Sequence, residues 1–186
     1  MKKIFTLFVL ALAFSFSYSL QGAVISVSPG TNVYTTCKNA ADGDIIEFTA
    51  LGDYSWTSTT SLSITAPKSL TLRAAQGLKG RPVLKVTQTV TYMFFYNVGT
   101  ASGNLHFEGI EINGNNNVSS ITVSKLAAGR NLNVYMDNCY VHGLASVSSL
   151  TVIAFSYPNT ATNLNPDSLV IKNSLFNVTG AGGMYC

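Results

Sequence analysis

The sequence carries little charge. Only 10% of its 186 residues are Asp, Glu, Lys or Arg, whereas a typical globular protein has about a quarter, and 47% are hydrophobic. Disordered chains usually combine high charge with low hydrophobicity, so this composition excludes a largely disordered protein. Glu, Lys and Arg, which favour helices, are scarce, while β-branched and aromatic residues abound. The chain is therefore expected to be one all-β domain of moderate size.

No apolar run is long enough to span a bilayer comfortably. The run from Ile4 to Phe16 follows Lys2 and Lys3 and precedes small residues at 17–19. This pattern predicts a signal peptide over residues 1–19, with cleavage as late as residue 23 as a second possibility. The protein is then exported to the periplasm, cell surface or extracellular space, without a membrane anchor; an uncleaved N-terminal anchor is the alternative.

Strong net charge is also missing. Removal of the two N-terminal lysines lowers the formal net charge from +3 to +1. Such a near-neutral exported chain does not indicate a nucleic-acid partner.

Cysteines are few and fit no zinc or redox spacing. The chain has three, at positions 37, 139 and 186, so an exported form keeps at least one unpaired. A bridge needs Cα atoms within about 7 Å, and the repeat described next separates Cys37 from Cys139 by several coils. We expect mostly free, buried thiols, while a bridge to Cys186 stays open.

One pattern recurs along the chain. Copies begin at Asn104, Asn133 and Ser168, with a fainter one at Ser69, and the starts differ by 35, 29 and 35 residues. A repeated strand–turn–strand unit of uneven length is typical of a wound strand array, a solenoid. Expected inward positions are Leu70 and Leu72, Leu105 and Phe107, Val134 and Met136, and Leu169 and Ile171. An antiparallel β-sandwich is the alternative fold.

The repeat also contains a turn column, formed by Gly109, Asn138 and Asn173, whereas Ala74 does not fit it. Gly and Asn most readily adopt a left-handed backbone. Asn138 and Asn173 are one coil apart, so their amides are expected to hydrogen-bond to each other. The alternative is that Asn is simply common in turns.

The N-terminal part differs from the repeat. A strand is expected over residues 24–28, a short helix from Thr31 or Asn32 to Ala41 with Val33 and Cys37 on one face, and a strand over 45–48 before a turn at 52–54. Residues 24–68 would form the cap and first strands, and residues 69–186 the coils. The Gly-rich end stops in mid-coil, so we expect further chain or another subunit to cover it.

Several motifs carry a family resemblance. They are residues 40–48 (AADGDIIEF), 52–54, 69–73, 107–110, 138–141 and 173–176. With these motifs the chain resembles the right-handed parallel β-helix of the pectate-lyase-like superfamily, and most closely the secreted chondroitinase B and alginate lyase type. The resemblance implies a right-handed parallel β-helix with a short N-terminal capping helix.

The resemblance also implies a chemistry, β-elimination on a uronic acid polymer. That reaction needs a base and a group that neutralises the carboxylate, often Ca²⁺. No catalytic Lys/Arg pair and no calcium-ligand triplet match this chain, so no catalytic residue is predicted.

Four columns of the repeat are expected to face outward. Two contain Thr71, His106, Tyr135 and Val170, and Arg73, Glu108, Asp137 and Lys172; the other two contain Glu111, Tyr140 and Leu175, and Asn113, His142 and Asn177. In the charged column we expect Arg73 to pair with Glu108 and Lys172 with Asp137; alternatively, Glu108 and Asp137 hold Ca²⁺. His106 and Tyr135 are candidate binding residues, and His106 beside Tyr135 could transfer protons. The alternative is that both are ordinary surface residues.

Basic residues gather in one stretch of the sequence. Five of them lie between Lys68 and Lys85, with Tyr92, Phe95 and Tyr96 soon after. Arg73, Lys79 and Arg81 are candidates for binding an acidic saccharide, and a solvated loop is the alternative. Three functions follow: an exported module that binds polysaccharide, the N-terminal part of a calcium-assisted polysaccharide lyase, or a structural or adhesive surface solenoid.

Overall fold

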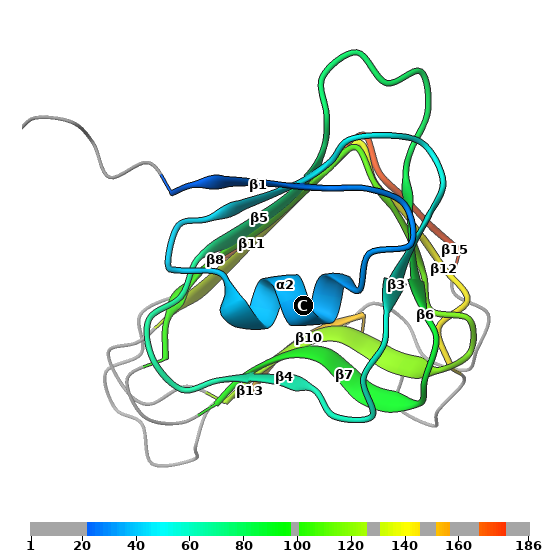
Figure 1. Ribbon diagram of the computed structural model, residues 1–186. Helices are drawn as coiled ribbons and strands as arrows, with labels where there is room; N and C mark the ends of the chain where they lie inside the picture. The colour runs from blue at the N-terminus through cyan, green and yellow to red at the C-terminus, as the bar shows by residue number, and fades with distance from the viewer. Residues whose placement is uncertain (1–21, 98–100, 126–130, 146–151, 157–167, 178–186) are drawn as a thin grey trace, which may run out of the picture.

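The computed structural model describes residues 22–97, 101–125, 131–145, 152–156 and 168–177. Within them the chain forms three sheets of parallel strands and one helix (Figure 1). The predicted signal peptide over residues 1–19 and the chain end at 178–186 lie outside the described residues. No helix in the described part is both long and apolar enough to cross a membrane.

Sheet A has six strands and the other two sheets have fewer. Sheet A contains β1 (Val24–Val27), β2 (Ile45–Phe48), β5 (Leu70–Ala74), β8 (Gly103–Glu108), β11 (Leu132–Asp137) and β14 (Ser168–Lys172). Sheet B contains β3 (Asp53–Trp56), β6 (Val83–Val86), β9 (Glu111–Asn113), β12 (Tyr140–His142) and β15 (Leu175–Asn177). Sheet C contains β4 (Leu62–Ile64), β7 (Val90–Tyr96), β10 (Val118–Lys125) and β13 (Ile153–Ser156).

The chain visits the sheets in the order A, B, C and then returns to A, and we call each such pass a coil. Every strand pairs in parallel with the equivalent strand of the next coil. Antiparallel hairpins are absent from the described strands, so the β-sandwich alternative is wrong. The parallel sheets that the repeat predicted are confirmed.

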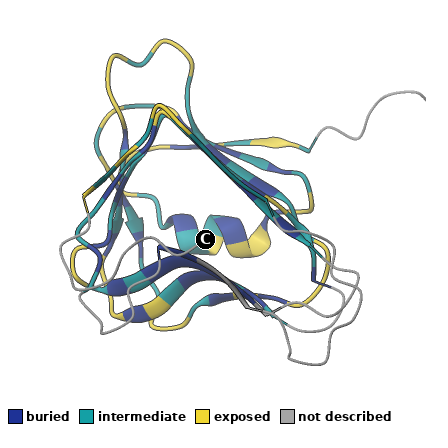
Figure 2. Cartoon of the chain, turned by 180° about the vertical axis from the view of Figure 1, so that it is seen from behind, coloured by how far each residue is buried: buried dark blue, intermediate teal, exposed yellow. Residues whose placement is uncertain are grey.

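The register of sheet A reproduces the columns of the repeat. Leu70 lies opposite Leu105, Leu105 opposite Val134, and Val134 opposite Leu169. Side chains alternate across a strand, so this register sends the same repeat positions inward in every coil. The inward residues of β5, β8 and β11 are buried and those of β14 are partly buried (Figure 2).

A further coil precedes the first recognisable repeat. In it β2 pairs with β5, β3 with β6, and β4 with β7. Tyr54, expected in a turn, lies in β3, where it and Trp56 are fully buried. This coil does not match the repeat in sheet B, because Tyr54 and Trp56 there align with Leu84 and Val86 of the next coil.

Helix α2 (Val33–Asn39) lies across the N-terminal end of the stack (Figure 1). Asn32 is its N-cap, and the Asn32 side chain accepts a hydrogen bond from the backbone N–H of Tyr34 at 3.2 Å. Val33 and Cys37 are fully buried against the core. The predicted capping helix is therefore confirmed.

Two of the three cysteines are described. Cys37 and Cys139 are buried and free, as expected, and Cys186 lies outside the described residues. Both thiols behave as small apolar core residues, and burial is the main cause that raises the pKa of each.

The turn column has the backbone that its residue types indicate. Gly109, Asn138 and Asn173 have φ values of 66°, 53° and 51°, in the left-handed region. The expected amide ladder between Asn138 and Asn173 is wrong, because each side chain bonds elsewhere. Asn138 Oδ1 accepts from Arg81 Nη2 at 2.6 Å, and Asn173 Nδ2 donates to Asp137 Oδ1 at 3.0 Å.

A polar ladder does exist, at the first position of each repeat. Asn133 Nδ2 donates to Asn104 Oδ1 at 2.9 Å, and Ser168 Oγ donates to Asn133 Oδ1 at 2.7 Å. Ser69 Oγ accepts from the backbone N–H of Asn104 at 3.1 Å. These bonds join four successive coils, which explains why each repeat begins with Ser or Asn.

Candidate functional site

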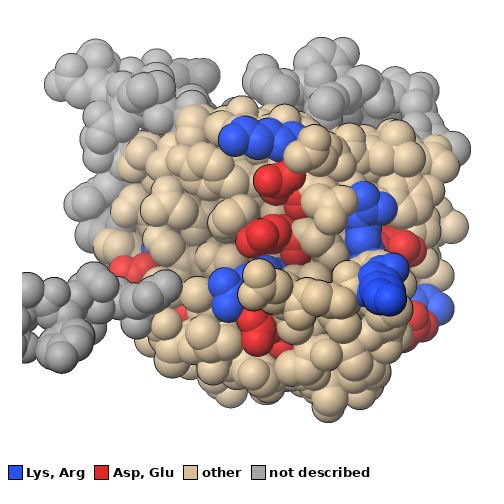
Figure 3. Space-filling model, turned by 90° about the horizontal axis from the view of Figure 1, so that it is seen from above, with Lys and Arg blue, Asp and Glu red and all other residues tan. Residues whose placement is uncertain are grey.

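The outer surface of sheet A holds most of the candidate residues, and we call it the sheet A face. It consists of the outward columns Thr71, His106, Tyr135 and Val170, and Glu47, Arg73, Glu108, Asp137 and Lys172. Each outward residue follows an inward residue of its strand, and side chains alternate along a strand, which fixes its direction. Viewed from above, acidic and basic side chains form a band across the coils of this face (Figure 3).

The charged column pairs differently from the expectation. Arg73 Nη2 lies 2.8 Å from Glu47 Oε2, and Arg73 Nε donates to the same oxygen at 3.0 Å. Arg73 therefore pairs with the coil that precedes the first repeat at Ser69, and the repeat does not reveal that coil. The expected Arg73–Glu108 pair is wrong. The expected Lys172–Asp137 pair is likewise not formed.

This pairing leaves two acids on the face without a basic partner. In the described part of the chain, neither Glu108 nor Asp137 forms an ion pair, and the Asp137 carboxylate accepts a hydrogen bond from the neutral amide of Asn173. Glu108 and Asp137 are register partners on β8 and β11, so their backbones lie about 4.8 Å apart. Two neighbouring carboxylates therefore face solvent together, with Arg73 and Lys172 one coil away on either side.

His106 and Tyr135 form an aromatic pair next to these acids. Their ring centroids are 5.9 Å apart in an edge-to-face arrangement. The pair borders a hollow of about 180 Å³ whose other walls include Asp137, Val170 and Lys172. A second hollow of about 320 Å³ lies at Glu47, Arg73, Gln76 and Glu108. The face is thus hollowed on both sides of the acidic pair.

The side chains of the sheet A face can bind a ligand, and His106 with Tyr135 is a candidate pair for proton transfer. Tyr135 and His106 offer ring surfaces to a sugar, and Arg73 and Lys172 offer positive charge to a carboxylate. The described residues contain no group of three or more His, Cys, Asp or Glu side chains that could hold a metal. Two carboxylates alone provide too few oxygens for a Ca²⁺ cage made only of protein.

Other predicted binding residues lie away from this face. Lys79 and Arg81 are exposed in the connection from β5 to β6. Arg81 Nε donates to the Asn138 carbonyl oxygen at 2.7 Å. The guanidinium thus links the β5–β6 connection to the turn column two coils further along. Sequence reasoning placed these basic residues together, whereas the structure separates them.

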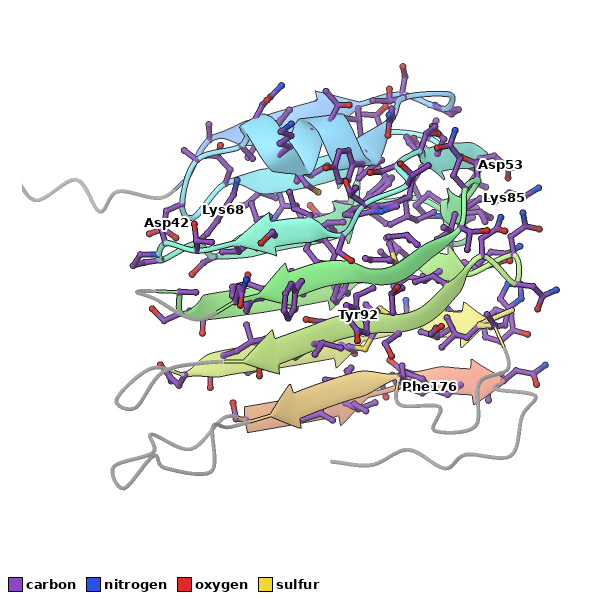
Figure 4. All side chains as sticks on the ribbon, turned by 90° about the horizontal axis from the view of Figure 1, so that it is seen from below. Asp42, Asp53, Lys68, Lys85, Tyr92 and Phe176 are labelled. Atoms are coloured by element: carbon purple, nitrogen blue, oxygen red, sulfur yellow. The ribbon has the colours of Figure 1, made fainter. Side chains whose placement is uncertain are left out.

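The three aromatic residues after the basic stretch do not lie on one surface. Tyr96 points inward, is fully buried and donates its hydroxyl to the Lys68 carbonyl at 2.8 Å, so it does not contribute to a saccharide surface. Tyr92 and Phe95 are half-buried, with ring centroids 5.8 Å apart. They lie on sheet C, away from the sheet A face (Figure 4).

One contact between a histidine and a carboxylate was missed by sequence reasoning. His142 Nε2 lies 2.9 Å from Glu111 Oε1 on sheet B, and the Tyr140 ring stacks on His142 at 4.6 Å. Tyr140 is the register partner of Glu111, so the Glu111–His142 contact runs diagonally between columns. The columns alone could not reveal it, because they align only direct partners.

Comparison with solved structures identifies the fold. The chain is similar to the PL6 family alginate lyase AlyGC, with 21% identity and a TM-score of 0.55, and to a mutant of that enzyme, with 23% identity and a TM-score of 0.58. Each match covers 86% of this chain and 20% of the lyase chain, so the chain spans about a fifth of the enzyme's length. The likeness confirms the parallel β-helix, pectate-lyase-like fold.

Two other comparisons found nothing. No family model matches the chain, and no curated protein does.

Proposed function

We propose that this protein is an exported right-handed β-helix whose sheet A face binds an acidic polysaccharide, with Ca²⁺ bridging protein and polymer. The observation that carries the proposal is the pair Glu108 and Asp137, two adjacent outward carboxylates without an ion pair in the described chain. Their cationic neighbours and the His106–Tyr135 pair supply the other contacts that a charged sugar needs.

A Ca²⁺ ion between protein and polymer would offset the repulsion between their carboxylates. Ca²⁺ takes six to eight oxygen ligands in flexible geometry, and two protein carboxylates leave several positions for sugar carboxylates and hydroxyls. An ion held partly by the polymer fits this donor set better than a resident ion does. Arg73 and Lys172, on either side, would pair with carboxylates further along the polymer.

The proposal includes a right-handed solenoid and export after cleavage of the signal peptide. Seen from the N-terminal end, the chain runs clockwise as it recedes, which supports a right-handed solenoid (Figure 1). Cleavage after residue 19 would keep the backbone N–H of Ala23 bonded to the buried carboxylate of Asp44 at 2.9 Å. Cleavage after residue 23 would remove that bond, so we favour the earlier site, and mass spectrometry of the exported protein tests it.

Binding is tested by calorimetric titration of the exported protein with alginate, pectate and chondroitin sulfate, with Ca²⁺ and with excess chelator. Neutral dextran is the control polymer. We expect Ca²⁺-dependent binding to an acidic polymer, and its loss in the double variant Glu108→Gln, Asp137→Asn. The matched control is Asp53→Asn, an exposed acid on sheet B. Absence of binding to every acidic polymer would leave the structural or adhesive solenoid as the function.

A lyase is the second candidate, favoured by the likeness to AlyGC and by the His106–Tyr135 pair beside the acids. β-Elimination would need one of these side chains as the base and Ca²⁺ to neutralise the sugar carboxylate. Incubation with each acidic polymer, followed by ultraviolet absorbance of the unsaturated product, tests it. Product formation that persists in a Tyr135→Phe, His106→Gln double variant would show that this pair is not the base.

A further inference from the structure

A pocket of about 340 Å³ lies between α2 and β4, on another side of the molecule from the sheet A face. We call it the cap pocket; it is lined by Tyr34, Lys38 and residues 61–68. Its volume lies at the small end of the usual range for ligand sites, about 300–1,000 Å³, and suits one or two sugar units.

Two walls of the cap pocket carry polar groups from different elements. Tyr34 and Lys38 are four residues apart on α2 and therefore share one face of the helix. The opposite wall is β4, the edge strand of sheet C. Among the described strands β4 has no neighbour on its outer side, so backbone groups there lack a ladder partner and are available to a ligand.

The cap pocket is positively charged. Lys68 Nζ donates to the carbonyl oxygens of Cys37 at 2.8 Å and Lys38 at 3.3 Å, which are neutral partners. An ammonium has three N–H donors, so the third has no partner among the described residues. Neither Lys38 nor Lys68 forms an ion pair within the described chain, and no acid lines the pocket. Asp42 and Asp44 act on Lys68 only from a distance.

The titration of the lining groups agrees with this geometry. Burial lowers the pKa of Lys68, because its charge is only partly solvated. Hydrogen bonds from Thr60 and Ser58 lower the pKa of Tyr34, and the nearby charge of Lys38 adds to them. An anion bound beside Lys68 would favour its charged ammonium and so oppose the effect of burial.

We propose that the cap pocket binds a small sugar acid, its carboxylate held between Lys38 and Lys68 and its hydroxyls by Tyr34, Ser61, Ser63 and the free edge of β4. The hydroxyl-rich walls favour a polyol over a bare inorganic anion. This site is separate from the sheet A face and does not rest on the polysaccharide proposal.

Trp56 provides the assay, since it is the only tryptophan and its ring lies 5.5 Å from that of Tyr34. The exported protein is titrated with sodium glucuronate, glucose and inorganic phosphate, followed by Trp56 fluorescence and checked by calorimetry. Glucuronate should bind, and glucose should bind at least about tenfold more weakly, since a charge-assisted hydrogen bond contributes at least that factor.

Lys38→Gln should weaken glucuronate binding about tenfold, and Tyr34→Phe should weaken it less. Lys85→Gln is the matched control; Lys85 lies across the molecule from Lys68 (Figure 4). Thermal unfolding of each variant verifies that it folds.

Three results would overturn the proposal: no glucuronate binding, equal weakening by Lys38→Gln and Lys85→Gln, or phosphate binding as tight as glucuronate. The last result would mean that the pocket takes simple anions. Because the probe is a monosaccharide and the variants leave the sheet A face intact, failure here is distinguishable from failure of polymer binding.

Discussion

Replacement of Asn138 by Gly and by Ala separates the two roles of the turn column. The Asn138 backbone is left-handed, with φ of 53°, and its side chain accepts a hydrogen bond from Arg81. Both replacements remove the Arg81 Nη2–Oδ1 bond. The Ala variant keeps a Cβ in this conformation but loses the polar side chain that lets Asn adopt it, whereas the Gly variant has no Cβ to disfavour it.

The magnitudes follow from these two terms of the folding free energy. The Arg81 contact is exposed and contributes roughly 0–1 kcal/mol. Glycine also gives the unfolded chain more freedom, which costs roughly 0.4–1 kcal/mol. A left-handed Ala costs roughly 1–2 kcal/mol. We expect Asn138→Ala to be less stable than Asn138→Gly by about 1 kcal/mol.

Urea unfolding measures this difference, followed by circular dichroism and by Trp56 fluorescence, with free energies taken from midpoints and slopes. Asn173 is the internal control, because its backbone has the same hand without an Arg81 contact. The Ala–Gly difference should be equal at the two positions. An Ala variant as stable as the Gly variant at both positions would refute the argument that backbone conformation selects Asn and Gly in this column.

Three further predictions concern the core. Burial raises the pKa of Cys139 to about 11 and that of Cys37 still further. The stability that the neutral thiols contribute is therefore complete below pH 9 and decreases as pH rises toward 11. Urea unfolding midpoints measured across this pH range test this decrease. Thr122→Val should stabilise the protein by about 1 kcal/mol in thermal unfolding, because the fully buried Thr122 hydroxyl has no hydrogen-bond partner among the described residues. In a Cys186→Ser variant, neither remaining thiol should react with a thiol reagent until the protein is unfolded.

The part of the fold that could be predicted is the part that depends on alternation and stacking. Leu105 and Val134 align because both must face the same core, and the sequence shows that directly. The partner of Arg73 could not be predicted, since Glu47 belongs to a coil whose core includes Phe48, Tyr54 and Trp56 and does not match the Leu-rich pattern. Likewise, the hydrogen bonds of Asn138 depend on a loop whose path the repeat does not determine.

The basic stretch shows why neighbours in the sequence of a coiled chain are poor guides to a binding surface. One coil passes through all three sheets, so residues a few positions apart face different directions. Lys68 lies at α2, Arg73 on the sheet A face, Arg81 at the turn column and Lys85 on sheet B. Residues about 30 positions apart, such as His106 and Tyr135, instead become direct neighbours. A binding surface on this fold is therefore to be sought in the register columns. There Glu108 and Asp137 stand out, because neither forms an ion pair with a basic side chain of the described residues.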